Sequence, residues 1–104
     1  MGIAVERHDG GVAVVTLSEE AARNALTRTF MHEMSGVMGG LLDDSTCKAI
    51  VLTGTGRFFC TGADIDEFAD SIDDGSIANL VDELTSVLHP LELRLRRSPT
   101  VFIA

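Results

Sequence analysis

The segment with the clearest capacity for chemistry is a glycine-rich loop between a short apolar run and an acidic helical start. It contains Gly54 and Gly56, and it ends on Gly62-Ala63, directly before residues 64–68. Small residues let backbone N–H groups approach a ligand closely. Such donors at a helix N-terminus suit a developing negative oxygen, because the helix dipole is positive there. The same pattern also fits a tight strand-to-helix turn without a chemical role.

The elements before this loop begin with a hairpin pattern. Residues 3–8 and 12–17 are β-rich runs on either side of Asp-Gly-Gly at residues 9–11. This spacing predicts a hairpin, because glycine supplies the positive φ that the turn needs. The second run is apolar at nearly every position, which predicts a strand buried on both faces.

A helix is predicted next. Apolar residues recur at helical spacing from Phe30 to about Leu42, and Thr27 or Asn24 is the expected N-cap. Three glycines lie inside the pattern and each costs the helix up to about 1 kcal/mol relative to alanine. They allow either close packing or an early helix end.

The second half of the chain repeats the alternation of strand and helix. Residues 49–53 are a β-branched apolar run that feeds the glycine loop, and the polar residues 71–76 predict a mobile surface loop. Residues 77–97 carry a long helical pattern, in which Pro90 predicts a kink or a break just before it. Residues 100–104 read as a strand by composition. The whole order predicts one α/β domain, with ligands at the carboxyl ends of the strands.

Composition excludes several functions. The net charge is −8 and the isoelectric point is about 4.6, which argues against a nucleic-acid partner. Cys47 and Cys60 have neither zinc-ligand spacing nor nearby histidine partners, so we expect free thiols and no metal site. No signal peptide or membrane-spanning apolar run is recognisable, so a cytoplasmic protein without a membrane partner is expected.

Four segments, in order along the whole chain, resemble the crotonase (enoyl-CoA hydratase/isomerase) superfamily. Residues 57–65 (RFFCTGADI) resemble its oxyanion-loop motif, and residues 49–54 (AIVLTG) resemble the strand before that loop. Residues 22–26 (ARNAL) and 98–104 (SPTVFIA) are similar to two further family segments. The resemblance implies a crotonase-like ββα superhelix, of which residues 1–104 would be the N-terminal part. It also implies homotrimers or hexamers.

The resemblance implies an enzyme that acts on acyl thioesters, most often of coenzyme A, with no tightly bound cofactor. In this family two backbone N–H groups stabilise a thioester enolate, and the motif places the first of them on Ala63. The residues implied to bind the coenzyme A part of the substrate are Arg23, Ala25, Leu26, Thr61, Gly62, Ala63, Asp64 and Ile65.

Several side chains around the loop have a chemical and a structural interpretation. The family's counterpart of Asp64 usually caps the loop, and we favour that role over a catalytic acid. Cys60 is expected to be a buried small hydrophobic residue, and His89 a surface residue rather than part of the acyl pocket. Arg23 either reaches a phosphate or is a solvated charge. Asp66 stands where several relatives have lysine, so an acyl group on a carrier protein is an alternative substrate.

The resemblance also implies that the second oxyanion donor and the acid–base glutamates lie beyond Ala104. The chain alone is then expected to be inactive. Because its last residues read as an apolar strand, we expect a split or cleaved chain that pairs with a C-terminal half. The alternative from another functional class is a non-catalytic scaffolding half that assembles with a second chain.

Overall fold

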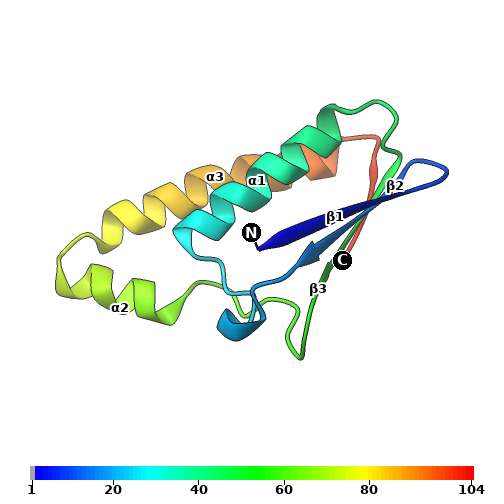
Figure 1. Ribbon diagram of the computed structural model, residues 1–104. Helices are drawn as coiled ribbons and strands as arrows, with labels where there is room; N and C mark the ends of the chain where they lie inside the picture. The colour runs from blue at the N-terminus through cyan, green and yellow to red at the C-terminus, as the bar shows by residue number, and fades with distance from the viewer. Residues whose placement is uncertain (1) are drawn as a thin grey trace.

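A four-stranded sheet and three α-helices make up the fold in the computed structural model, which describes residues 2–104 (Figure 1). The elements in chain order are β1 (Ile3–His8), β2 (Val12–Leu17), a 3-10 turn (Glu20–Ala22), α1 (Arg28–Asp43), β3 (Ala49–Gly54), α2 (Ile65–Asp73), α3 (Ile77–Arg97) and β4 (Val101–Ile103).

The strands lie in the order β1-β2-β3-β4. β1 and β2 pair antiparallel with Val5 opposite Val15, so the predicted hairpin is confirmed. Its turn uses Gly10 and Gly11 at φ of 83° and 84°, the left-handed region that glycine adopts without steric cost. β3 and β4 join the sheet in parallel, with Ile50 beside Ala13 of β2 and Phe102 of β4.

Two long helices cover one face of this sheet. In Figure 1, α1 and α3 run side by side, and α2 lies below the N-terminal half of α3. Alternate residues of β2 and β3 meet the apolar stripes of the two helices. The buried core consists of Ala13, Val15, Leu17, Phe30, Met31, Met34, Met38, Leu41, Cys47, Ile50, Leu80, Leu84 and Leu91.

The second face of the sheet is more open than the sequence predicted. β2 alternates between buried and partly exposed residues, and Val12, Val14 and Thr16 are the partly exposed ones. Val101 and Ile103 of β4 are more than half exposed on the same face. The prediction that β2 is buried on both faces is therefore wrong for this chain, because the helices pack on one side only.

The helix predicted from Phe30 begins slightly earlier. Thr27 is its N-cap, since the Thr27 hydroxyl accepts a hydrogen bond from the Phe30 N–H at 3.1 Å. α1 then runs to Asp43 through all three glycines. Space is open around Gly36 and Gly40, so neither of them is required for close packing.

Two predictions in the second half need correction. α2 extends through residues 71–73, so the connection to α3 is shorter than the predicted loop. Ser71 is buried, and the Asp74 N–H donates to the Asp70 carbonyl at 3.0 Å, so helical hydrogen bonding continues to the end of α2. α3 is not broken before Pro90. The carbonyl that loses its helical donor at Pro90 belongs to Ser86, an exposed residue that water can reach.

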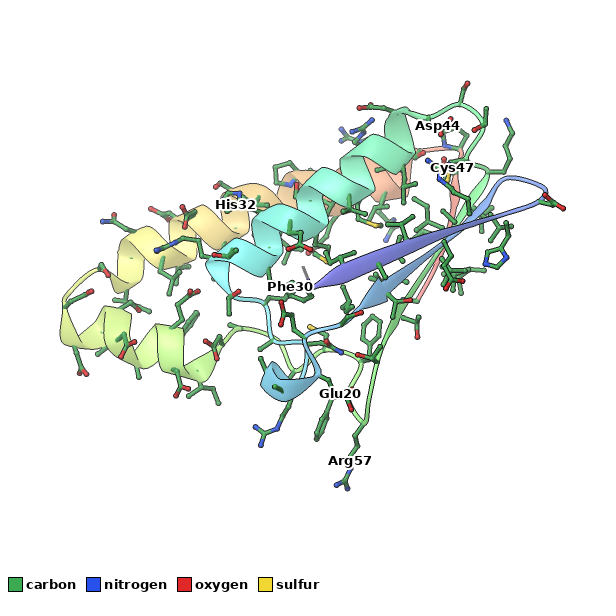
Figure 2. The ribbon with its side chains drawn as sticks, in the orientation of Figure 1. Glu20, Phe30, His32, Asp44, Cys47 and Arg57 are labelled. Carbon is green, nitrogen blue, oxygen red and sulfur yellow. The ribbon has the colours of Figure 1, made fainter. Side chains whose placement is uncertain are left out.

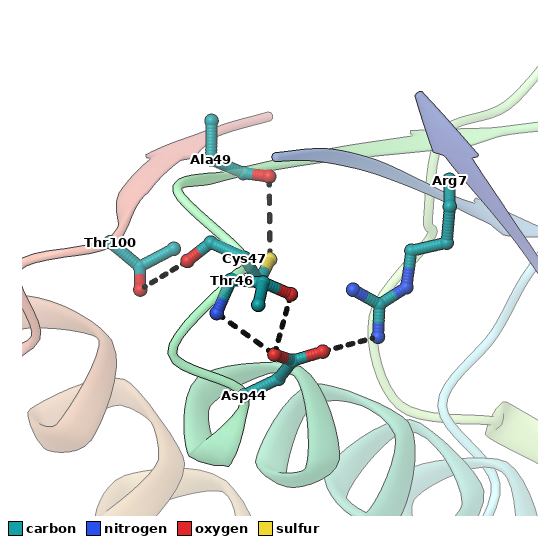
Figure 3. Close-up of polar contacts among 6 residues, drawn as sticks. All are labelled: Arg7, Asp44, Thr46, Cys47, Ala49 and Thr100. Carbon is teal, nitrogen blue, oxygen red and sulfur yellow. Dashed lines mark hydrogen bonds and ion pairs between the residues drawn. The ribbon is translucent and has the colours of Figure 1, made fainter. Parts of the chain in front are cut away.

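A polar cluster ties the end of α1 to the sheet (Figure 3). The Asp44 carboxylate accepts hydrogen bonds from the Thr46 N–H at 2.9 Å and the Thr46 hydroxyl at 2.7 Å, and it pairs with Arg7 of β1 at 3.0 Å. The Thr100 hydroxyl donates to the Cys47 carbonyl at 3.4 Å, which links the start of β4 to the same turn. Asp44 has a pKa below its ordinary 3.8, chiefly because the Thr46 hydroxyl and N–H stabilise the carboxylate.

Candidate functional site

Two segments that lie far apart in the sequence meet beyond the carboxyl end of β3. One is the turn at residues 19–26, and the other is the glycine loop at residues 54–63. The Leu26 N–H donates to the Gly62 carbonyl at 2.7 Å, and Leu26 forms a parallel bridge with Ala63. The loop is therefore held against the turn just before α2 begins.

This contact determines the direction of the Ala63 N–H. The Gly62 carbonyl points toward Leu26, and no peptide bond among residues 2–104 is cis. In a planar trans peptide the N–H points opposite to the carbonyl of the same unit, so the Ala63 N–H points away from Leu26. No hydrogen bond within residues 2–104 uses this N–H as donor. Gly62 makes the required bend at a φ of 93°.

A pocket of about 300 Å³ opens on one side of Ala63. Its lining combines short side chains with charged ones from both segments and from the start of α2. The lining residues are Ala22, Arg23, Ala25, Thr61, Ala63, Asp64, Ile65 and Asp66. Six of the eight residues predicted from the sequence to bind the coenzyme part therefore surround one pocket.

An apolar pocket of about 280 Å³ lies on the other side of Ala63. It contains the remaining two predicted residues, Leu26 and Gly62, and extends between α1, α2 and α3. Its full lining is Leu26, Met31, Gly62, Ala63, Phe68, Val81, Leu84, Thr85 and Leu88. The Thr85 hydroxyl donates to the Val81 carbonyl at 2.9 Å, which leaves little polarity for a ligand. Ala63 is the residue that borders both this pocket and the polar one.

One cationic side chain, that of Arg23, lines the polar pocket. Arg23 is exposed, and its guanidinium lies over the Phe58 ring at 5.9 Å from the ring centre. Arg57 lies at the same distance from that ring, and Figure 2 shows it at the tip of the loop after β3. Asp64 and Asp66 contribute the opposite charge to the pocket wall. Any bound anion is therefore favoured at the Arg23 side of the pocket.

Three side chains differ from the sequence interpretation or sharpen it. Asp64 occupies the N-cap position of α2, but its side chain makes no capping hydrogen bond. Cys60 is partly exposed rather than buried. His89 is exposed on α3, as expected for a surface residue. On α3, Leu84 lines the apolar pocket, whereas Leu80 is fully buried in the core.

The sequence interpretation missed Asn24 and most of the helical wall of the apolar pocket. Val81, Thr85 and Leu88 follow helical spacing, so they could have been assigned to one face of α3, but not to a pocket. The sequence predicts Asn24 only as an alternative to Thr27 for the N-cap of α1. In the structure it is fully buried and bonds to the glycine loop instead.

Two absences hold for the part of the chain that the structure describes. Residues 2–104 contain no group of three or more side chains arranged to ligate a metal. None of the helices in this range combines the length and the apolar character that crossing a membrane requires.

The fold and the site place the chain in a general class of proteins: it is an α/β protein with a backbone N–H donor between a polar and an apolar pocket. The sequence model of the enoyl-CoA hydratase/isomerase family matches residues 7–103. The chain belongs to this family, and its fold is the crotonase type.

Individual relatives agree with this assignment. A probable peroxisomal enoyl-CoA hydratase of Arabidopsis thaliana is 32% identical over 75 residues, which are 72% of this chain and 28% of that protein. A short-chain-enoyl-CoA hydratase of Clostridium acetobutylicum is 43% identical over 63 residues, 60% of this chain and 24% of that protein. The crystal structure of an enoyl-CoA hydratase from Bacillus halodurans has a TM-score of 0.84 at 18% identity, and the match covers 98% of this chain and 40% of that one. The chain thus spans less than half of these proteins.

Proposed function

We propose that this chain carries the thioester-binding part of an enzyme of the enoyl-CoA hydratase/isomerase type. The observation that carries the proposal is the Ala63 N–H, which has no partner within residues 2–104 and belongs to the residue shared by a polar and an apolar pocket. A thioester has the same division: an acyl chain, a carbonyl oxygen at the junction, and a polar carrier.

The chemistry follows from that arrangement. The acyl chain enters the pocket between α1, α2 and α3, and the carrier lies along the turn at residues 22–26. The thioester oxygen then accepts a hydrogen bond from the Ala63 N–H. In hydration, water adds to the β-carbon of an enoyl thioester, its proton passes to a carboxylate supplied from outside this chain, and the electrons of the double bond move onto the thioester oxygen. In isomerisation the same carboxylate takes a proton from the carbon next to the carbonyl, and in either case the bond from Ala63 strengthens as negative charge grows on this oxygen. One donor of this kind is worth about 2.7–4 kcal/mol of the barrier.

The proposed substrate is a coenzyme A thioester, with an acyl carrier protein as the alternative. Arg23 at the rim suits a phosphate, whereas Asp66 in the pocket wall opposes one. Competition between free coenzyme A and an acylated carrier for the same site decides between them. A preference for the carrier would be explained by Asp66, and Asp66→Lys is then expected to restore binding of coenzyme A.

Residues outside this chain complete the proposed enzyme. By the family resemblance, they supply the second oxyanion donor and the acid–base carboxylates, either as a second chain or as a fragment of the same domain. We propose a homotrimer or hexamer in the cytoplasm for the completed protein. The 104-residue chain alone is expected to hydrate no substrate.

The test is hydration of crotonyl-coenzyme A by the chain assembled with the residues that complete the domain. Ala63→Pro removes the N–H, because proline has no backbone donor. We expect about a 10²–10³-fold fall in kcat for a variant whose circular dichroism is unchanged. A folded wild-type assembly that turns over no thioester would refute the enzyme, and would leave the scaffolding half as the function to pursue. Unchanged kcat in Ala63→Pro would refute the role of Ala63.

A further inference from the structure

Asn24 connects the two segments of the site through its side chain. Its Oδ1 accepts a hydrogen bond from the Glu19 N–H at 2.8 Å, within its own turn. Its Nδ2 donates to the Thr55 carbonyl at 3.2 Å and the Phe58 carbonyl at 3.0 Å, both in the glycine loop. The side chain is 0% exposed. The Asn24 end of each bond is therefore shielded from water, and breaking any of them leaves a buried amide atom of Asn24 short of a partner.

The backbone of Asn24 suits this residue type. Its φ is 56°, in the left-handed region where asparagine is several-fold enriched over most side chains. Its own N–H donates to the Glu19 carbonyl at 2.9 Å. This conformation turns the side chain inward, toward the loop, while the neighbouring Arg23 remains exposed at the rim of the polar pocket.

Gly54 makes the approach possible. A Cβ at Gly54 would lie 2.8 Å from the Asn24 Nδ2 and 2.7 Å from the Phe59 carbonyl oxygen. Real Cβ atoms essentially never come this close to such atoms, so any side chain at position 54 would push the loop and Asn24 apart. Glycine at the end of β3 and asparagine in the turn thus form one contact.

We propose that Asn24 is a positioning residue for the Ala63 N–H, an inference that rests on the proposed function. The turn holds the loop at two points: Asn24 binds its beginning at Thr55 and Phe58, and the Leu26 N–H binds its end at Gly62. Since the Gly62–Ala63 peptide carries the proposed donor, these two anchors set where the donor points. Asparagine is needed because the site requires one acceptor and two donors on a short side chain.

Asn24→Asp tests this role. Aspartate keeps the acceptor for the Glu19 N–H but brings a carboxylate against the Thr55 and Phe58 carbonyls, so the first anchor is lost. Asn79→Asp is the matched control, because Asn79 is exposed on α3 and undergoes the same change of charge. Both variants are studied in the chain assembled with the residues that complete the domain.

The probe is acetoacetyl-coenzyme A, whose enolate absorbs in the near ultraviolet. An oxyanion donor lowers the pH at which the bound thioester forms its enolate. Misplacing a catalytic group by about 1 Å costs on the order of 100-fold. We therefore expect the enolate transition to move up by about two pH units in Asn24→Asp and to stay in place in Asn79→Asp. A loss of folded protein alone would lower the amplitude of the transition and leave its midpoint unchanged.

Each outcome decides one of the two proposals. If the wild-type assembly lowers the enolate midpoint and folded Asn24→Asp has the same midpoint, the positioning role is refuted and the proposed function stands. If the wild-type assembly binds no thioester, the proposed function fails. If the wild-type assembly binds no thioester, or if Asn24→Asp does not fold, hydrogen exchange of the wild-type chain tests whether Asn24 anchors the loop. We expect the side-chain amide of Asn24 to exchange far more slowly than that of Asn79, and equal rates would overturn the anchor.

Discussion

Substituting alanine for glycine is expected to have opposite effects at two positions of this chain. At Gly54 the added Cβ would meet the Phe59 carbonyl oxygen at 2.7 Å and the Phe59 Cα at 3.2 Å, both backbone atoms, as well as the Asn24 amide. Backbone cannot rotate away as the end of a long side chain can. At Gly40 in α1, a Cβ would meet nothing within 4 Å.

The magnitudes follow from these surroundings. Overpacking a close contact costs about 1–3 kcal/mol, so Gly54→Ala should lower the free energy of unfolding by about that amount. Gly40→Ala adds no clash and restricts the unfolded chain, so it should raise the free energy of unfolding by about 0.5–1 kcal/mol. In a domain of this size each kcal/mol moves the Tm by roughly 4–8 °C. The two variants should therefore melt on opposite sides of the wild type.

Urea and thermal unfolding followed by circular dichroism measure both changes. The denaturant slope should be the same in all three proteins, so that the midpoints report stability directly. A Gly54→Ala protein as stable as the wild type would show that the loop can move away from Asn24 at little cost. That result would refute the close packing of β3 against the turn at residues 19–26, and with it the structural basis for Asn24 as an anchor.

Two further predictions concern the core and the turn after α1. Leu80 is 0% exposed, so Leu80→Ala should lower the free energy of unfolding by about 2–5 kcal/mol, measured by urea unfolding. Leu93 on the same helix is 53% exposed, so Leu93→Ala should change this free energy little. Equal losses in the two variants would contradict the packing of α3. In the folded protein the pKa of Asp44 is lowered, chiefly by the Thr46 hydroxyl and N–H and also by Arg7. The Asp44 carboxylate therefore stabilises the fold above pH 3.8, the pKa of the unfolded chain. This contribution is lost as the pH falls through the lower pKa of the folded state. Asp44→Asn should therefore be less stable than the wild type at neutral pH and should lose less stability on acidification. Urea midpoints measured across this pH range test the prediction. Parallel pH profiles for the wild type and the variant would contradict it.

Much of the fold could be predicted from local pattern. The hairpin depends on glycines at residues 10 and 11, and α1 depends on the Thr27 cap and the spacing of its apolar residues. These signals are local, since they need only neighbours within a few positions. The length of α2 was missed because its polar composition resembles that of a loop. The contacts that hold it, the buried Ser71 and the Glu67 carboxylate that accepts the Arg28 N–H at 2.9 Å, come from the fold.

The open face of the sheet was also beyond local pattern. The run at residues 12–17 is apolar on both sides, which predicts burial on both. Whether the second side is covered depends on which elements pack there, and here the helices lie on the other face. Composition gives the tendency to be buried, and the packing of distant segments decides whether it happens.

The sequence by itself determined the family, the order of the elements and the loop that ends on Ala63, because each of these is written in contiguous residues. Only the tertiary structure decided how the site is built from them. It brought the turn at residues 19–26 against a loop more than 30 positions away, through bonds of Asn24 that no spacing rule predicts. It also aimed the Ala63 N–H away from Leu26 and set a polar and an apolar pocket on its two sides. Backbone direction depends on long-range hydrogen bonding, and that information appears only when the segments meet.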